Sequence, residues 1–323
     1  MVTELCCYYC FAAPSPDHPL TTDELVAVGV FESFSAKNKK LENDGLTAMT
    51  KVEGSAADLV LAGCNSLIFI DGEVAGDPLE SAALKAMRWE VKGETGKIRP
   101  KAKTEKREEG KAFTVNNTKT KEITVLHRHH FSSKLQPMSC IVRDGSGRVF
   151  VVVKGSPEAI GERVLDKHSD YDATSTTLSK KGLRVIGLGY KQIEPGQVAD
   201  FTSKRDLCEC ELTFSGFIAF TCRVRKDTKN VLGVLKGAGM SVAMVTGDNL
   251  LTAANVAKEV AICTDEAKIL ILEKADTGMF WKKYSNDSKF KDYVADDVPA
   301  LAKEVRTGTN QSGPATTIDH CIH

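Results

Sequence analysis

The chain has 323 residues, its 43 basic and 43 acidic side chains cancel, and its hydrophobic and charged contents are 42% and 27%. This length predicts about two domains with real cores, and the balanced charge gives no sign of a nucleic-acid or anionic-membrane partner. No run approaches the roughly 18 apolar residues of a membrane span, so we expect this chain not to cross a bilayer. Scattered cysteines without a secretory signal favour reduced thiols in a cytosolic setting.

The first predicted elements follow an irregular start. Residues 1–20 carry three prolines within six residues and show no clear period. From residue 22 the pattern becomes strand-like, and residues 36–54 are polar and predict a loop. Residues 55–91 predict a helix, a turn and a second helix that begins near Pro78. Proline at a first helical position, followed by Glu80 in the first turn, suits a helix start.

Hairpin signals dominate the middle of the chain. Residues 92–111 form a charged, low-complexity run that predicts an exposed loop. Short apolar segments with hairpin-like breaks follow, and the DGSG at 144–147 between two apolar runs is a strong hairpin signal. Residues 22–213 therefore predict an α+β domain built on an antiparallel sheet.

The pattern changes after residue 213. An apolar run, a helical segment, a Gly-rich turn and a second apolar run predict a βαβ unit, as in a parallel sheet covered on both faces. The second run stops in Thr246, Gly247 and Asp248, directly before a helix. This arrangement places polar side chains at a strand end beside a helix N-terminus, where open α/β sheets bind phosphates. Residues 264–323 contain one helical stretch and a polar end that we expect to be partly disordered.

Two residues in the middle of the chain suit nucleotide contacts. Lys154 ends an apolar run, and Gly155 follows it. A lysine on a rigid strand end, beside a glycine that allows close approach, suits a phosphate; the alternative is a solvated edge lysine. Phe131 could stack on a base if it were exposed, whereas most phenylalanines are core residues.

Metal and redox sites are disfavoured. His127 and His129 would share one strand face and His130 the other, and no cysteine or acid falls at ligand spacing. Cys7 and Cys10 form a C-x-x-C pair, but the Pro-rich stretch that follows offers neither a βαβ context nor further zinc ligands. Arg225 lies between an apolar run and a helix, where a cation could neutralise phosphate oxygens; the alternative is a solvated helix start.

Several motifs occur in one order along the chain: GDPLESAAL, HRHHFSSKLQPMS, VKGSPEAI, KKGLRVIGLGY, RKDTKNVL and MVTGDNLLTAANVAKEVAI. In that order they resemble the nucleotide-binding and phosphorylation domains of P-type ATPases, over residues 20 to about 263. GDPLE followed by a Trp-containing helix, together with FSSxLxxMS, is most similar to type V and to its endoplasmic-reticulum branch.

The resemblance implies a role for each matching residue. Phe131 would stack on adenine and Glu80 would lie near the base. Lys154 and Gly155 would line the nucleotide pocket, and Arg184 would reach the phosphates. Two further groups complete the assignment: Arg225 near the hinge between domains, and Thr246, Gly247 and Asp248 around the phosphorylated centre.

The resemblance also implies an activity. Family members use ATP and Mg to phosphorylate an aspartate in D-K-T-G-T, and its hydrolysis drives transport, together with an actuator domain and transmembrane domains. The intact protein would lie at the cytosolic face of an intracellular membrane, the endoplasmic reticulum for this branch, where the family suggests extraction of misinserted transmembrane segments.

The sequence departs from the family at the phosphorylation motif. Cys6 and Cys7 lead into a Pro-rich stretch with no D-K-T-G-T, and its one acid, Asp17, lies between prolines. The magnesium motif T-G-D-G-x-N-D and the actuator motif T-G-E are also absent. We therefore expect this chain alone to be inactive: either a piece of a working pump whose insert is a gene-model error, or a non-catalytic nucleotide-binding or interaction module. A soluble phosphatase is disfavoured because D-x-D-x-T/V is missing.

The predicted architecture combines an α/β part with an α+β part. The antiparallel nucleotide-binding domain (22–213) would be inserted into an incomplete Rossmann-like, haloacid-dehalogenase-type phosphorylation domain. That second domain would comprise a damaged start (1–21) and a βαβ remnant (214–263), followed by the tail (264–323).

Overall fold

The computed structural model describes residues 25–32, 46–70, 73–92, 113–117, 122–132, 136–222, 224–240, 242–244, 246, 248–264, 269–275, 278–284 and 289–292. The chain divides into two compact units. The sheet unit comprises Leu20–Leu178 and Leu183–Cys222, and the C-terminal unit comprises Met1–Pro19, Ser179–Gly182 and Arg223–His323. The damaged start expected at 1–21, residues 93–111 of the charged loop and residues 293–323 of the tail lie outside the described residues.

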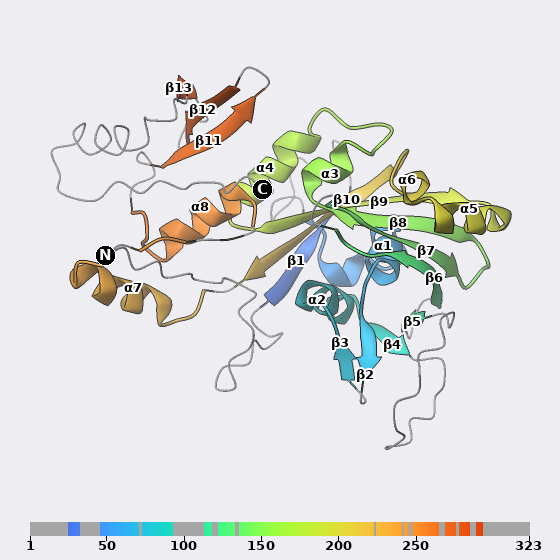
Figure 1. The fold of residues 1–323 in the computed structure, drawn as a ribbon. Coiled ribbons are helices and arrows are strands. Elements are labelled where there is room, and N and C mark those ends of the chain that lie inside the picture. Colours follow the sequence, from blue (N-terminus) through green and yellow to red (C-terminus); the bar gives the residue numbers. More distant parts are fainter. Residues whose placement is uncertain are drawn as a thin grey trace. The chain divides into compact units, whose positions relative to one another are not determined.

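An eight-stranded sheet forms the centre of the sheet unit, and every neighbouring pair of strands is antiparallel (Figure 1). This confirms the antiparallel sheet predicted from the hairpin signals. In spatial order the strands are β1 (Leu25–Phe31), β10 (Thr213–Cys222), β9 (Arg184–Ile193), β8 (Val149–Gly155), β7 (Met138–Asp144), β6 (Ile123–His129), β5 (Phe113–Asn117) and β4 (Trp89–Lys92).

Two helices cover one face of this sheet. The Ser55 side chain caps α1 (Ala56–Gly63) by accepting from Asp58 N, and Asp77 caps α2 (Pro78–Ala86) by accepting from Leu79 N. The helix start predicted at Pro78 is therefore confirmed. Short elements surround these helices: η2 (Met49–Lys51) and the hairpin of β2 (Ile68–Ile70) and β3 (Glu73–Ala75).

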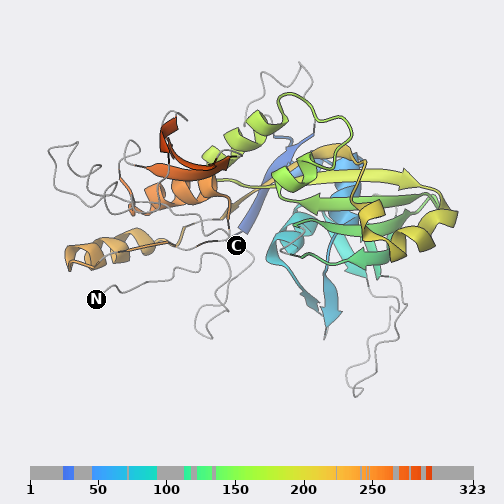
Figure 2. The ribbon, with the colours of Figure 1, turned by 45° about the horizontal axis from the view of Figure 1, so that its top comes forward.

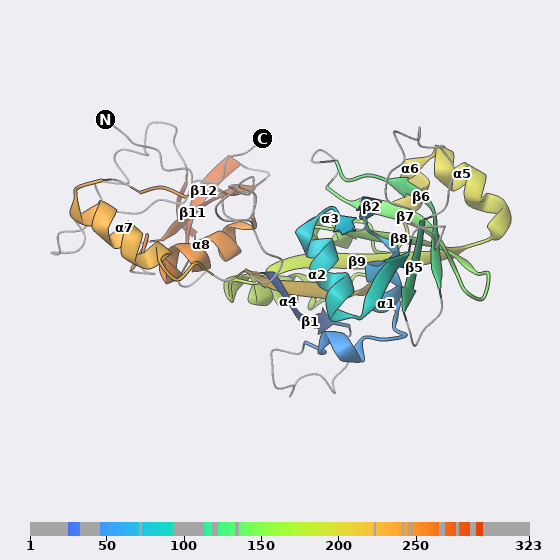
Figure 3. The ribbon, with the colours of Figure 1, turned by 90° about the horizontal axis from the view of Figure 1, so that it is seen from below.

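The opposite face is covered by α3 (Pro157–Gly161), α5 (Val198–Ser203) and α6 (Arg205–Cys208), with η3 (Pro195–Gln197) leading into α5. Figure 3 shows α5 and α6 next to β6 and β7. Strand β8 explains the two cores: Val151 and Val153 pack on this side, and Val152 packs with the α1 and α2 side. An uninterrupted apolar run is expected for a strand buried on both faces. A third apolar cluster joins α4 (Tyr171–Lys180) to β10 and β1.

The DGSG hairpin forms as predicted between β7 and β8. Asp144 Oδ1 accepts from the backbone N–H groups of Ser146 and Arg148, at 2.9 and 3.0 Å, and Gly147 adopts a φ of 89°. An aspartate that bonds its own turn, followed by a glycine with positive φ, is the chemistry such a turn requires.

The segment 213–222 corrects one expectation. We predicted a strand of a parallel βαβ unit, but β10 pairs antiparallel with both β1 and β9, and the described residues 242–244 lie in no strand. Phe217, Ile218 and Ala219 are fully buried. An apolar run signals burial on both faces, and an antiparallel sheet covered on both sides produces it as well as a parallel one. The helix predicted after this strand does form, as α7 (Thr228–Gly237).

The C-terminal unit contains α7, α8 (Leu250–Glu259) and a small antiparallel sheet of β11 (Leu270–Ala275), β12 (Gly278–Lys283) and β13 (Lys289–Asp292). Leu232 packs α7 against α8, and Ile271 and Tyr284 pack the small sheet against α8. Figure 2 shows the small sheet next to α8. We predicted a helical stretch and a polar tail beyond 264, so these strands were missed. None of the helices in the described ranges has the length and apolar character to cross a membrane.

Candidate nucleotide-binding site

Strand register gathers three of the predicted residues at one end of the large sheet. Lys154 on β8 is the strand partner of Met138 on β7. Ser139, the residue after Met138, is the strand partner of His129 on β6. Phe131 follows β6 by two residues, so it leaves the sheet at the end where β8 finishes with Lys154 and Gly155. The tertiary structure therefore brings together residues that are more than twenty positions apart in sequence.

Lys154 forms an ion pair with Glu80, the acid in the first turn of α2. The Lys154 side chain is 16% exposed and that of Glu80 is 4% exposed. Glu80 Oε2 also accepts from Ser66 N at 2.7 Å and from Ser66 Oγ at 2.9 Å. The alternative of a solvated edge lysine is wrong. Asp77 caps the start of α2, which places Glu80 in the first turn of that helix, and Glu80 holds Lys154 on the face of the sheet that the helix covers.

The charges around this pair act on one another. Burial by itself would lower the pKa of Lys154, but the charge of Glu80 and its hydrogen bond outweigh burial and raise that pKa. Lys154 is therefore a cation at neutral pH. Burial lowers the pKa of Arg128, although the nearby charge of Glu80 acts in the opposite direction. The Nε atom of Arg128 donates to Asn65 O at 2.8 Å. Arg128 was not among the residues predicted from the sequence, because the three histidines around it suggested a metal site instead.

The Phe131 side chain is 63% exposed, so the alternative that it is a core residue is wrong. A ring of this size in water loses the hydrophobic stabilisation that most phenylalanines gain. Its position just beyond β6 presents an aromatic face at the sheet end that carries Lys154. The arrangement can stack a planar ring system at the end of the sheet that also holds a buried cation.

Gly155 is explained first by packing within the chain. A Cβ atom built there would lie 3.1 Å from Pro137 Cα and 3.2 Å from Gln136 O. Both neighbours are in the segment that returns from Phe131 to β7. The close approach that we expected a ligand to use is used here by the polypeptide itself, and a pocket-lining role for Gly155 stays a prediction.

Arg184 begins β9, three residues before Gly187, the strand partner of Gly155. At the rise of an extended strand this places the Cα atoms of Arg184 and Gly187 about 10 Å apart. Arg184 is half-buried, and its predicted contact with phosphates stays a prediction.

The other predicted residues belong to the C-terminal unit. Arg225 is exposed, and its Nε lies 3.6 Å from Asp227 Oδ1. Thr246 Oγ1 accepts from Asp248 N at 3.1 Å, and Asn249 then caps α8 by accepting from Leu251 N at 2.9 Å. The helix predicted after Asp248 is confirmed. Gly247 lies outside the described residues, and a phosphate at this turn stays a prediction.

The described residues contain no group of three His, Cys, Asp or Glu side chains that could hold a metal ion. The rings of His127 and His129 meet edge to face with centroids 4.5 Å apart, and His129 Nε2 lies 3.1 Å from Phe201 O. Burial, followed by the neighbouring histidines, lowers the pKa of His127. His129 thus contacts the backbone of α5.

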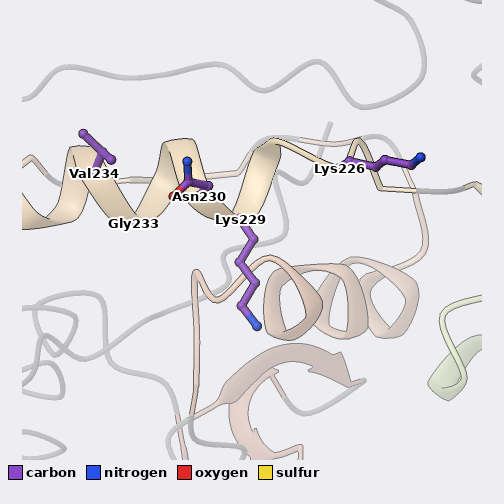
Figure 4. Close-up of a pocket in the computed structure, with 5 residues that line it drawn as sticks. All are labelled: Lys226, Lys229, Asn230, Gly233 and Val234. Atoms are coloured by element: carbon purple, nitrogen blue, oxygen red, sulfur yellow. The ribbon is translucent and has the colours of Figure 1, made fainter.

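A shallow hollow lies along α7. Figure 4 shows Asn230 and Val234 extending to one side of the helix and Lys229 to the other; Lys226 and Gly233 complete the lining. None of the residues predicted for nucleotide or phosphate lines it.

A family model described as "P-type ATPase, cytoplasmic domain N" matches residues 60–227, just over half of the chain. This chain belongs to the P-type ATPases. The match contains the sheet end with Phe131, Lys154 and Glu80, and it extends beyond the sheet unit to the beginning of the C-terminal unit.

Curated P-type ATPases align with most of this chain. "Probable manganese-transporting ATPase PDR2" of Arabidopsis thaliana is 32% identical over 99% of the chain and 23% of its own length. The "Endoplasmic reticulum transmembrane helix translocase" of Saccharomyces cerevisiae is 32% identical over 79% of the chain and 19% of its own length. The protein of that name in Schizosaccharomyces pombe is 27% identical over 88% and 22%. The resemblance to type V is thus confirmed, and the chain spans about a fifth of each relative.

Proposed function

We propose that the sheet unit is an ATP-binding N domain, with the base held at the sheet end between Phe131 and the Glu80–Lys154 pair. The observation that carries the proposal is the exposed ring of Phe131 at the same end of the sheet as the buried Lys154–Glu80 ion pair. Stacking would use the aromatic face, and the charged pair that is fixed by α2 and β8 would supply a donor and an acceptor at this end of the sheet. Lys154 and Gly155 would line the pocket, and Arg184 would reach the phosphates.

The C-terminal unit is proposed to contain part of a Rossmann-like phosphorylation domain, into which the sheet unit is inserted. Thr246, Gly247 and Asp248 would surround its phosphorylated centre, with Arg225 near the hinge. The turn that Thr246 and Asp248 form before α8 supports this assignment, because a helix N-terminus favours negative charge. Mg would accompany the nucleotide in the intact protein; the described residues offer no cluster that fits its ligands, so no step is assigned to it here.

The intact protein is proposed to be an ATP-driven transporter at the endoplasmic reticulum, with its N domain on the cytosolic face. Support comes from the two relatives named as translocases of that membrane. Its partners would be the actuator and transmembrane domains. The alternative, a non-catalytic nucleotide-binding or interaction module, is favoured by one observation: the sequence contains no D-K-T-G-T. Binding does not need that aspartate, whereas turnover does.

Isothermal titration of the purified 323-residue chain with ATP tests the N-domain proposal. Phe131→Ala should weaken binding by about 1–3 kcal/mol, the range measured for a base stacked on an aromatic side chain. Leu165→Ala is the matched control, because Leu165 is 65% exposed in the same unit and lies in no predicted contact with nucleotide. Equal affinity of the wild type and Phe131→Ala would refute the adenine assignment.

Labelled ATP tests the missing nucleophile. We expect no acid-stable phosphoenzyme from this chain, because an acyl phosphate requires the absent aspartate. A labelled band after acid quenching would contradict that expectation and would make the chain itself catalytic.

A further inference from the structure

One guanidinium group joins the two ends of the segment that carries Phe131. Arg205, the first residue of α6, donates from Nη1 to His130 O at 2.9 Å and from Nη2 to Pro137 O at 2.8 Å. His130 immediately precedes Phe131, and Pro137 immediately precedes β7. The contacts therefore join His130 and Pro137 through the Arg205 side chain, across 75 and 68 positions of the sequence.

The Arg205 side chain is itself held in place. Its Nε donates to Glu209 Oε1 at 2.7 Å, and the same oxygen accepts from Ser139 Oγ at 3.0 Å. The Glu209 side chain is only 6% exposed, and Ser139 is fully buried in β7. A planar guanidinium that is fixed by a buried carboxylate presents its remaining donors in a set direction.

Gln136 and Pro137 are restrained by further contacts. Gln136 N donates to Ser132 O at 2.7 Å, and the backbone of Gln136 and Pro137 packs against Gly155. Phe131 nevertheless stays exposed. A restrained backbone under an exposed ring lowers the conformational entropy that is lost when a ligand stacks on that ring.

We propose that Arg205 is a positioning residue for base stacking: it clamps His130 and Pro137 so that the ring of Phe131 is presented in a fixed place. This inference rests on the proposed function of the sheet unit. Arg205 acts through Phe131 and needs no contact with the nucleotide. Through Arg205, the segment of η3, α5 and α6 would contribute to nucleotide binding. None of the motifs that resemble P-type ATPases lies in this segment.

Two variants test the clamp in the full 323-residue chain. Arg205→Lys retains a charge for Glu209 but has no fork to bridge two carbonyl groups. Arg205→Met combined with Glu209→Gln removes both charges and so avoids an uncompensated buried carboxylate. Lys204→Met is the matched control: Lys204 is exposed, and its side chain makes no hydrogen bond or ion pair with the part of the chain that the structure describes.

ATP titrations should show affinities that are about 3–10-fold weaker for both Arg205 variants and unchanged for Lys204→Met, which corresponds to the cost of ordering one segment. In a Phe131→Ala background the same Arg205 variants should have no further effect, because the clamp then holds no stacking ring. Hydrogen exchange should also become faster at the amide of Gln136 in the Arg205 variants.

The outcomes separate the inference from the proposed function. If Phe131→Ala weakens binding and the Arg205 variants do not, the clamp is refuted and the ATP site stands. If the Arg205 losses add fully to that of Phe131→Ala, Arg205 acts by another route and the clamp is again refuted. If neither Phe131→Ala nor the Arg205 variants change ATP affinity, the adenine assignment and the inference fail together.

Discussion

The sheet unit and the C-terminal unit cover their apolar side chains to very different degrees. In β8 of the sheet unit, Val149 and Val151–Val153 are fully buried, because helices lie on both faces of the sheet. In α7 of the C-terminal unit, Leu232 is buried, but Val231 and Val234 are 47% and 65% exposed.

The difference shows what each unit depends on. A helix gains most of its stability from packing its apolar face, and a strand in a covered sheet has that packing on both sides. The sheet unit therefore supplies its own core. Helix α7 packs Leu232 against α8 and leaves Val231 and Val234 largely in water, so it gains less from burial than β8 does. Three sets of substitutions test this contrast.

The largest effect is expected at the buried ion pair of the sheet unit. Lys154→Met should lower the free energy of unfolding by about 3–5 kcal/mol, because it leaves the Glu80 carboxylate buried without its cation. Lys229→Met is the control on exposed α7, with a change within about 0.5 kcal/mol. Urea unfolding followed by circular dichroism measures both.

A second variant and the pH dependence sharpen this test. Lys154→Met with Glu80→Gln should recover much of the lost stability, because no charge is then buried. The pKa of Lys154 is raised in the folded state, so the contribution of the pair is complete below the ordinary lysine pKa and is lost as the pH rises through the raised value. The stability difference between the wild type and the Lys154→Met, Glu80→Gln variant, in which neither group titrates, should thus be constant at neutral pH and change only at strongly alkaline pH. A difference that changed around neutrality would contradict the assigned charges.

Glycine-to-alanine substitutions should change the free energy of unfolding by an intermediate amount, with opposite signs in the two units. Gly155→Ala should destabilise by about 1–3 kcal/mol, since its Cβ would press on the backbone of Gln136 and Pro137. Gly233→Ala should stabilise α7 by about 0.5–1 kcal/mol, because nothing lies within 4 Å and alanine favours a helix interior. Thermal unfolding measures both changes, and a stable Gly155→Ala protein would show that the segment after Phe131 yields easily.

The smallest effect is expected on α7. Val234→Thr should change the unfolding free energy by less than about 0.5 kcal/mol, because the side chain is mostly in water. Val151→Thr in β8 is the matched control and should cost more than 1 kcal/mol, since the new hydroxyl would be buried. A large loss for Val234→Thr would mean that α7 is covered in solution.

Local signals in the sequence determined several elements. Asp77 and Pro78 begin α2, DGSG closes the hairpin of β7 and β8, and the helix after Asp248 forms as α8. Each depends on side chains and backbone within a few residues, so a short window contains the whole cause. The ordered motifs also identified the P-type ATPase family, which the match to residues 60–227 confirmed.

Only the tertiary structure decided which elements meet. Strand β10 joined the antiparallel sheet, although its apolar run suits a parallel sheet equally well. Glu80 paired with Lys154 across 74 positions, and Arg205 reached His130 and Pro137 across 75 and 68. These contacts depend on strand register and on how the helices pack, and a periodic pattern records burial without recording the partner.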